Sequence, residues 1–132
     1  MFVERLATFS VAYSQHFGKR AHYIFGFRWY MEQNIADAQP DSLRYYRDAD
    51  GLEVDAIVEL RDGRWGAIEI KLGANKAEAA EHSLLRLRDK VAANPAARDP
   101  EPSFLPCLVG RTDFQYRMPS GVIVAPITEL TT

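Results

Sequence analysis

Cysteine is almost absent from this chain of 132 residues, since Cys107 is the only one. An intrachain disulfide and a zinc site built from several cysteines are therefore excluded. No apolar run approaches the roughly 20 residues that a helix needs to cross a bilayer, and no Gly/Ser-rich linker or repeat divides the sequence. The beginning of the sequence also lacks the charged, apolar and small-residue segments of a secretory leader. These absences predict one cytoplasmic domain over residues 1–132, with no membrane segment.

An excess of charge of one sign is also lacking. The chain has 16 Lys plus Arg against 18 Asp plus Glu, so its formal net charge is −2. This balance argues against a strongly basic nucleic-acid-binding tail but leaves room for a local basic patch. Hydrophobic residues make up 47% of the chain and charged residues 26%, which is typical of a globular domain with its own core.

Hydrophobic periodicity predicts helices at the start, a β-meander in the middle, and a helix followed by further strands. Three helices are expected, over residues 2–17, 22–38 and 76–93, the last of them capped by Asn75. Six strands are expected, over residues 43–47, 52–60, 65–72, 104–109, 114–117 and 122–125. Because a long helix between two strands permits a parallel crossover, the predicted fold class is α/β, with a mixed sheet flanked by helices.

Two neighbouring predicted strands carry acids on one face. Residues two apart in a strand share a face, so Glu53 lies beside Asp55 on one strand, and Glu69 lies beside Lys71 on the next. If the strands pair through their short turn, Asp55 and Glu69 are neighbours whose repulsion a divalent cation would relieve. Mg²⁺ or Mn²⁺ suits oxygen ligands, which predicts a metal site at Asp55 and Glu69, with Glu53 as a further ligand. Asp55, Glu69 and Lys71 are the candidate catalytic residues, with Lys71 holding a water or stabilising charge on a phosphate.

The same residues carry a resemblance to known families. Asp55, thirteen intervening residues and Glu69-Ile70-Lys71 resemble the signature of PD-(D/E)xK nucleases. The wider pattern over residues 45–72 is similar to the C-terminal domain of unknown function that follows an AAA-type ATPase domain in many prokaryotic proteins, and the likeness continues over residues 84–90 and 121–127. The resemblance implies a restriction-endonuclease-like fold and a module accessory to an ATPase. Since no phosphate-loop motif is present, it also implies a C-terminal module whose ATPase half lies elsewhere.

The sequence departs from that family in one respect. Such domains usually supply a further acid from the first helix, and residues 11–26 contain none, so the third metal ligand stays open. Two functions follow: a metal-dependent nuclease that hydrolyses DNA or RNA, or a catalytically degenerate module that binds nucleic acid or the ATPase. Without the resemblance, two acids and a lysine on adjacent strands most often form a solvated face with cross-strand ion pairs.

Other notable side chains have simpler interpretations. The histidines lack metal-ligand spacing, and Cys107, in an apolar strand, is expected to be an inert core thiol. Nucleic-acid binding is expected from the helical basic residues Arg86, Arg88 and Lys90, with Lys76. The aromatic stretch is expected to pack into the core or to form a homodimer interface through Phe25, Phe27, Trp29 and Tyr30.

Overall fold

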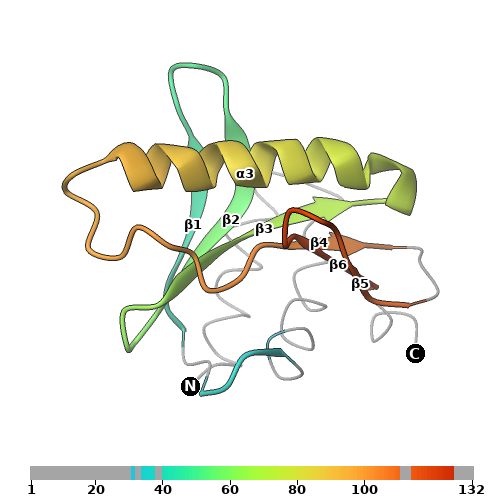
Figure 1. Ribbon diagram of the computed structural model, residues 1–132, viewed down its shortest axis with the longest axis horizontal. Coiled ribbons are helices and arrows are strands. Elements are labelled where there is room, and N and C mark those ends of the chain that lie inside the picture. Colours follow the sequence, from blue (N-terminus) through green and yellow to red (C-terminus); the bar gives the residue numbers. More distant parts are fainter. Residues whose placement is uncertain (1–30, 32–33, 38–39, 111–113, 127–132) are drawn as a thin grey trace.

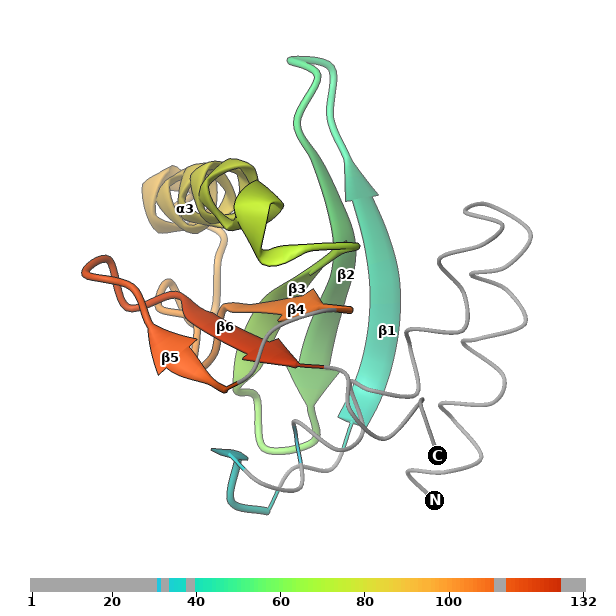
Figure 2. The same ribbon diagram turned by 90° about the vertical axis from the view of Figure 1, so that its right-hand side faces the viewer.

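The computed structural model describes residues 31, 34–37, 40–110 and 114–126 (Figure 1). Their strands form one mixed six-stranded sheet in the order β1-β2-β3-β4-β6-β5, and the long helix α3 lies across one face (Figure 2). The strands are β1 (Pro40–Arg47), β2 (Glu53–Leu60), β3 (Trp65–Lys71), β4 (Pro106–Val109), β5 (Tyr116–Arg117) and β6 (Ile123–Pro126). The predicted mixed α/β class is confirmed. The helices expected over residues 2–17 and 22–38, with the aromatic dimer surface, lie almost entirely outside the described residues.

Strands β1, β2 and β3 form the expected antiparallel meander. The first turn forms because the Asp48 carboxylate accepts hydrogen bonds from the backbone amides of Asp50 (2.9 Å) and Leu52 (3.1 Å), and Gly51 takes a positive φ of 86°. The β1–β2 register shifts between Arg44 and Tyr46, where β2 uses one residue more than β1. That irregularity in β2 falls at Asp55 and Ala56, and such bulges locally change where side chains point.

Helix α3 (Ala77–Ala93) connects β3 to the parallel strand β4. Its buried residues Ala77, Ala80, Leu84 and Leu87 follow the helical period that the sequence predicts. The predicted Asn75 cap is wrong, because Asn75 lies inside the short 3-10 helix η2 (Ala74–Lys76) and α3 starts after Lys76 with no side-chain cap. In the part of the chain that the structure describes, no helix has the length and apolar character needed to cross a membrane.

The start of β3 is fixed against the loop that precedes β4. Gly66 forms a parallel bridge with Phe104, and a Cβ atom at Gly66 would lie only 2.2 Å from the Phe104 ring. The Trp65 indole donates to the carbonyl of Asp99 (2.8 Å), and the Trp65 carbonyl accepts the amide of Ser103 (2.7 Å). These contacts set the register in which Glu69 on β3 lies opposite Cys107 on β4.

Candidate functional site

Asp55 and Glu69 meet where the regular pairing of β2 with β3 ends. Cross-strand partners run from Glu59 opposite Trp65 to Ala56 opposite Ile68. At the next position, the backbone amide of Asp55 donates to Oε1 of Glu69 (2.9 Å) and the amide of Ile70 donates to Oδ2 of Asp55 (2.8 Å). Each carboxylate thus accepts an amide of the opposite strand, and the structure brings the two acids together as strand alternation predicts.

Burial makes this pair electrostatically unusual. Asp55 is 5% exposed and Glu69 4% exposed, and they are the two buried charged residues in the described part of the chain. Burial, and after it the negative charge of Asp55, raise the pKa of Glu69 to about 7. The neighbouring Cys107 is fully buried, which raises the pKa of its thiol to about 12 and agrees with the expected inert core thiol. Two carboxylates are therefore held in a weakly solvated position where at least one resists ionisation.

Lys71 connects the buried acids to solvent. Its Nζ lies 3.4 Å from Oε2 of Glu69, and its side chain is 21% exposed whereas that of Glu69 is 5% exposed. The Lys71 carbonyl accepts the amide of Gly110, which holds the ends of β3 and β4 together. Asp55, Glu69 and Lys71 consequently form one cluster, the junction cluster, at the carboxyl end of β3.

Glu53, the further predicted ligand, is not part of this cluster. Its side chain is exposed and pairs with Arg47 at 3.4 Å. It also adds to the effect of burial in raising the pKa of Tyr45. Among the described residues, no group of three His, Cys, Asp or Glu side chains could hold a metal ion. The stretch 11–26, where a helix acid is expected in the resembling domains, lies outside the described ranges.

The basic residues of α3 are engaged by acids. Lys90 Nζ contacts both Asp48 and Asp50 of the β1–β2 turn, the latter at 2.9 Å, and Tyr46 also donates to Asp48. The ion pair with Lys90 is the main cause that lowers the pKa of Asp48 to about 2. No sequence signal indicates this contact, because Lys90 and Asp48 lie 42 residues apart.

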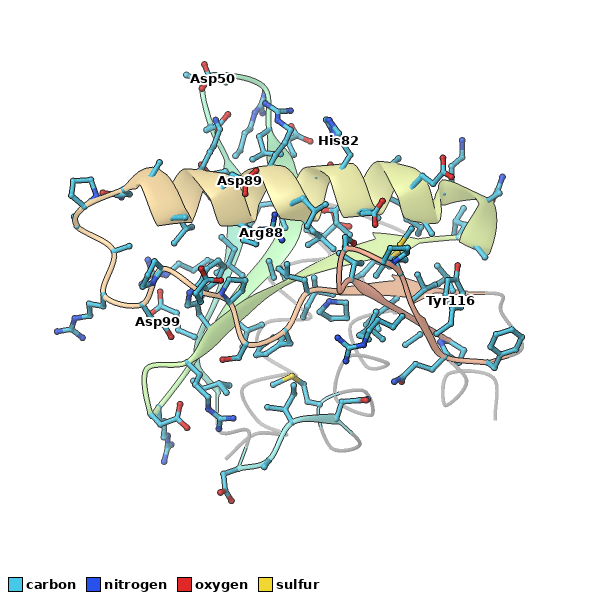
Figure 3. All side chains as sticks on the ribbon, in the orientation of Figure 1. Asp50, His82, Arg88, Asp89, Asp99 and Tyr116 are labelled. Atoms are coloured by element: carbon cyan, nitrogen blue, oxygen red, sulfur yellow. The ribbon has the colours of Figure 1, made fainter. Side chains whose placement is uncertain are left out.

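The remaining basic residues of α3 also lie beside acids. Arg88 pairs with Asp89 at 3.3 Å, and Figure 3 shows both on α3. Arg86 lines an open groove of about 720 Å³ between α3 and the β5–β6 turn. The groove also contains three acids, Glu78, Glu81 and Asp89, together with His82, and its lining does not include the junction cluster. The predicted phosphate-binding stripe on α3 is therefore largely compensated by acids.

Comparison with protein families matches residues 29–130 to a domain of unknown function, DUF4143. This match covers most of the chain and includes the whole junction cluster. No curated protein and no solved structure matches the sequence.

Proposed function

Because the chain belongs to the DUF4143 family of domains of unknown function, we propose its activity from the junction cluster: metal-dependent hydrolysis of nucleic-acid phosphodiesters. Asp55 and Glu69 would hold Mg²⁺ or Mn²⁺, and Lys71 would be the catalytic lysine. The similarity of Asp55 and Glu69-Ile70-Lys71 to the PD-(D/E)xK signature supports this assignment. So does the order of the elements, in which an antiparallel meander is followed by a helical crossover to a parallel strand, as expected for a restriction-endonuclease-like core.

The observation that carries the proposal is a pair of neighbouring buried carboxylates, each of which accepts a backbone amide of the opposite strand. A buried charge costs free energy unless it is paired, and two like charges in one place cost more. Lys71, at 3.4 Å from Glu69, supplies a compensating charge for that acid. A divalent cation between the two carboxylates would offset their mutual repulsion, which adds to burial in raising the pKa of Glu69.

The donor set fits such an ion. In each carboxylate one oxygen accepts a backbone amide, which fixes the orientation of the group. Because a carboxylate has about four lone-pair sites, it can contact a cation as well as its hydrogen-bond donors. Mg²⁺ commonly takes one or two carboxylates and completes its shell with water and substrate phosphate. When bound, the ion would supply Lewis-acid polarisation of the phosphate and a lowered pKa for a coordinated water.

The chain's own residues would prepare the substrate. The two backbone amides keep Asp55 and Glu69 in place without help from solvent, so little reorganisation accompanies the reaction. Lys71, partly exposed at the end of β3, would place its ammonium group near the phosphate and stabilise the negative charge that develops there. The bulge at Asp55 explains how a residue in a paired strand can turn its carboxylate toward the neighbouring strand.

A second function has one observation in its favour. The described residues offer two acids and no third ligand, which is also what a degenerate site retains. In that case the domain would serve as a binding module, for nucleic acid or for an AAA-type ATPase. The resemblance to the domain that follows such ATPases makes an ATPase partner part of both proposals.

A cleavage assay tests the proposal. Wild type, Lys71→Ala and Arg98→Ala are incubated with single-stranded, double-stranded and branched oligonucleotides in Mn²⁺. We expect cleavage by wild type and a loss of about 10²–10³-fold in Lys71→Ala, because one transition-state donor is removed. Arg98 is an exposed cation in the loop after α3, at the other end of the sheet, and its replacement should leave the rate unchanged. Binding without cleavage by wild type would instead favour the degenerate module.

A further inference from the structure

Two large apolar side chains are exposed in the described part of the chain, and both lie at the same end of the sheet. Leu72 is 67% exposed and Phe114 is 66% exposed. Leu72 directly follows Lys71, at the end of β3. Strands β3, β4 and β6 are parallel, and their ends lie at one level, because Lys71 is opposite Val109 and Val109 is opposite Pro126.

Strand register places Phe114 at that level too. Strand β5 runs antiparallel to β6, with Tyr116 opposite Val124. Two residues earlier, Phe114 therefore falls near Pro126, at the end of the sheet that faces the viewer in Figure 2. With strands about 4.8 Å apart, β5 lies about 14 Å from β3 across β4 and β6. That span corresponds to about four nucleotide steps of roughly 3.4 Å each along a stacked strand.

The Phe114 ring is held in place by its neighbours. It forms an edge-to-face pair with Tyr116, with ring centroids 6.0 Å apart and an angle of 62° between the ring planes. Tyr116 packs against the core beneath α3, and its position at the end of the sheet is labelled in Figure 3. Gln115, between the two aromatics, exchanges side-chain hydrogen bonds with Asn34. An exposed ring that is fixed by an anchored ring binds a flat ligand at a lower entropy cost than a mobile one.

We propose that Phe114, supported by Tyr116, is a stacking platform for unpaired nucleobases, and that Leu72 lines the path from this platform to Lys71. The inference rests on the proposed function, because it assigns the substrate class of the same site: nucleic acid with a single-stranded segment. Proteins that bind single strands combine exposed aromatic rings with cations that follow the phosphates. Lys71 at the end of β3 is the cation that strand register places at the level of the platform.

The exposed ring beside the candidate site favours this end of the sheet over α3. The basic residues Arg88 and Lys90 of α3 are paired with acids, and the α3 groove contains three carboxylates. A phosphate backbone would be repelled from that groove. At the carboxyl end of the sheet, the exposed Phe114 ring lies at the level of Lys71 and of the junction cluster.

Binding without divalent metal separates this inference from the proposed function. Fluorescence anisotropy with fluorescein-labelled dT15 and with a blunt 15-base-pair duplex compares wild type, Phe114→Ala, Phe114→Leu, Phe114→Tyr and Arg98→Ala. Loss of one stacked base should weaken dT15 binding about 5–100-fold in Phe114→Ala and in Phe114→Leu. Phe114→Tyr and Arg98→Ala should bind as wild type does, and duplex affinity should not change in any of the five proteins.

The outcomes are distinguishable. If Phe114→Ala or Phe114→Leu binds dT15 as tightly as wild type, or if wild type does not bind dT15, the platform is wrong even when the cleavage assay succeeds. If Phe114→Ala binds dT15 more weakly than wild type, and wild type cleaves none of the substrates, the platform is supported and the nuclease activity is rejected. Photocrosslinking of wild type to a 5-iodouracil oligonucleotide gives a second measurement: a crosslink at Phe114 or Tyr116 supports the platform, and crosslinks confined to α3 overturn it.

Discussion

Two acidic sites, Asp48 in the turn before β2 and the Asp55–Glu69 pair, differ in how their surroundings shift the pKa of a carboxyl group. At its start, Asp48 accepts two backbone amides and a Tyr46 hydroxyl and forms an ion pair with Lys90, and its pKa falls to about 2. Within β2, Asp55 is buried beside Glu69, and the pKa of Glu69 rises to about 7. The surroundings of Asp48 favour its ionised form, whereas those of Glu69 disfavour the ionised form. The Asp48 carboxylate is paired with a cation, whereas in the junction cluster burial and the charge of Asp55 disfavour the ionisation of Glu69.

The largest expected effect is on catalysis. Glu69→Gln should reduce Mn²⁺-dependent cleavage about 10²–10³-fold or more, because the amide cannot hold a cation as a carboxylate does. Asp48→Asn, with the same chemical change in the other acid group, should retain the wild-type rate. Single-turnover cleavage of an end-labelled oligonucleotide measures both. Equal losses in the two variants would mean that cleavage depends on overall integrity of the fold and not on the junction cluster.

The same Glu69→Gln substitution should make the folded protein more stable, although it reduces cleavage. At pH 8 without metal, Glu69→Gln should raise the free energy of unfolding by roughly 1–3 kcal/mol, since it removes a buried charge with a raised pKa and keeps an oxygen for the Asp55 amide. Urea unfolding followed by the fluorescence of the two tryptophans provides the measurement. A variant less stable than wild type would show that the carboxylate of Glu69 contributes to the fold.

A divalent metal ion should raise the thermal stability of wild type. A cation that binds only the folded state at tenfold above its dissociation constant stabilises by about 1.4 kcal/mol. Millimolar Mn²⁺ should therefore raise the melting temperature of wild type, and Asp55→Asn should abolish the rise while leaving the metal-free melting temperature unchanged or higher. Differential scanning fluorimetry with and without EDTA checks this. The same rise in Asp55→Asn would place the ion elsewhere.

Removal of the negative charge of Asp48 should make the protein less stable. Asp48→Asn keeps an oxygen for the amides of the turn but loses the ion pair with Lys90, so we expect a melting temperature lower by a few degrees. Lys90→Met should give a similar decrease, and the double variant should add little, because both changes remove one interaction. Strictly additive decreases would contradict the pairing.

Acid titration should separate the two groups through opposite slopes. Glu69 binds its proton more tightly in the folded state, so metal-free stability should rise as the pH falls from about 8 toward 4.5, and Glu69→Gln should lack this rise. Asp48 binds its proton more weakly in the folded state, so its contribution should persist above about pH 4 and disappear as the pH falls toward 2. Melting temperatures across this range, compared with Asp48→Asn, test both slopes. If Glu69→Gln gives the same dependence of melting temperature on pH as wild type, the slope assigned to Glu69 is wrong.

Local periodicity predicted much of the described fold. The alternation of Leu52 to Leu60 and the turn residues on both sides predicted the meander, and the apolar spacing of α3 predicted its buried face. The ends of elements were less accurate, as with Asn75, because η2 and the start of α3 depend on how the chain leaves β3. The helix between the third and fourth predicted strands indicated a parallel crossover, but the sheet order and the choice of β4 as the partner of β3 depend on contacts distant in sequence.

The junction cluster was predicted in part. Period-two alternation was enough to bring Asp55 and Glu69 together, but it treats both strands as regular. It therefore missed the bulge at Asp55 and the exchange of amide hydrogen bonds. The same alternation included Glu53, which the structure pairs with Arg47. Neither Lys90 with Asp48 nor Phe114 at the level of Lys71 could be predicted, since both require the three-dimensional arrangement.

The close approach of Gly66 to the Phe104 ring has a consequence for how sequences of this family vary. A Cβ atom at position 66 would lie only 2.2 Å from the Phe104 ring, so any side chain there must displace the ring. We therefore expect glycine at this position in every folded member, active or inactive. Positions 55 and 69 should behave differently. Selection for folding alone permits Asn or Gln at these sites, and only selection for chemistry retains the acids. A library of variants sorted once for folding and once for cleavage would distinguish the position that evolution preserves for architecture from those it preserves for activity.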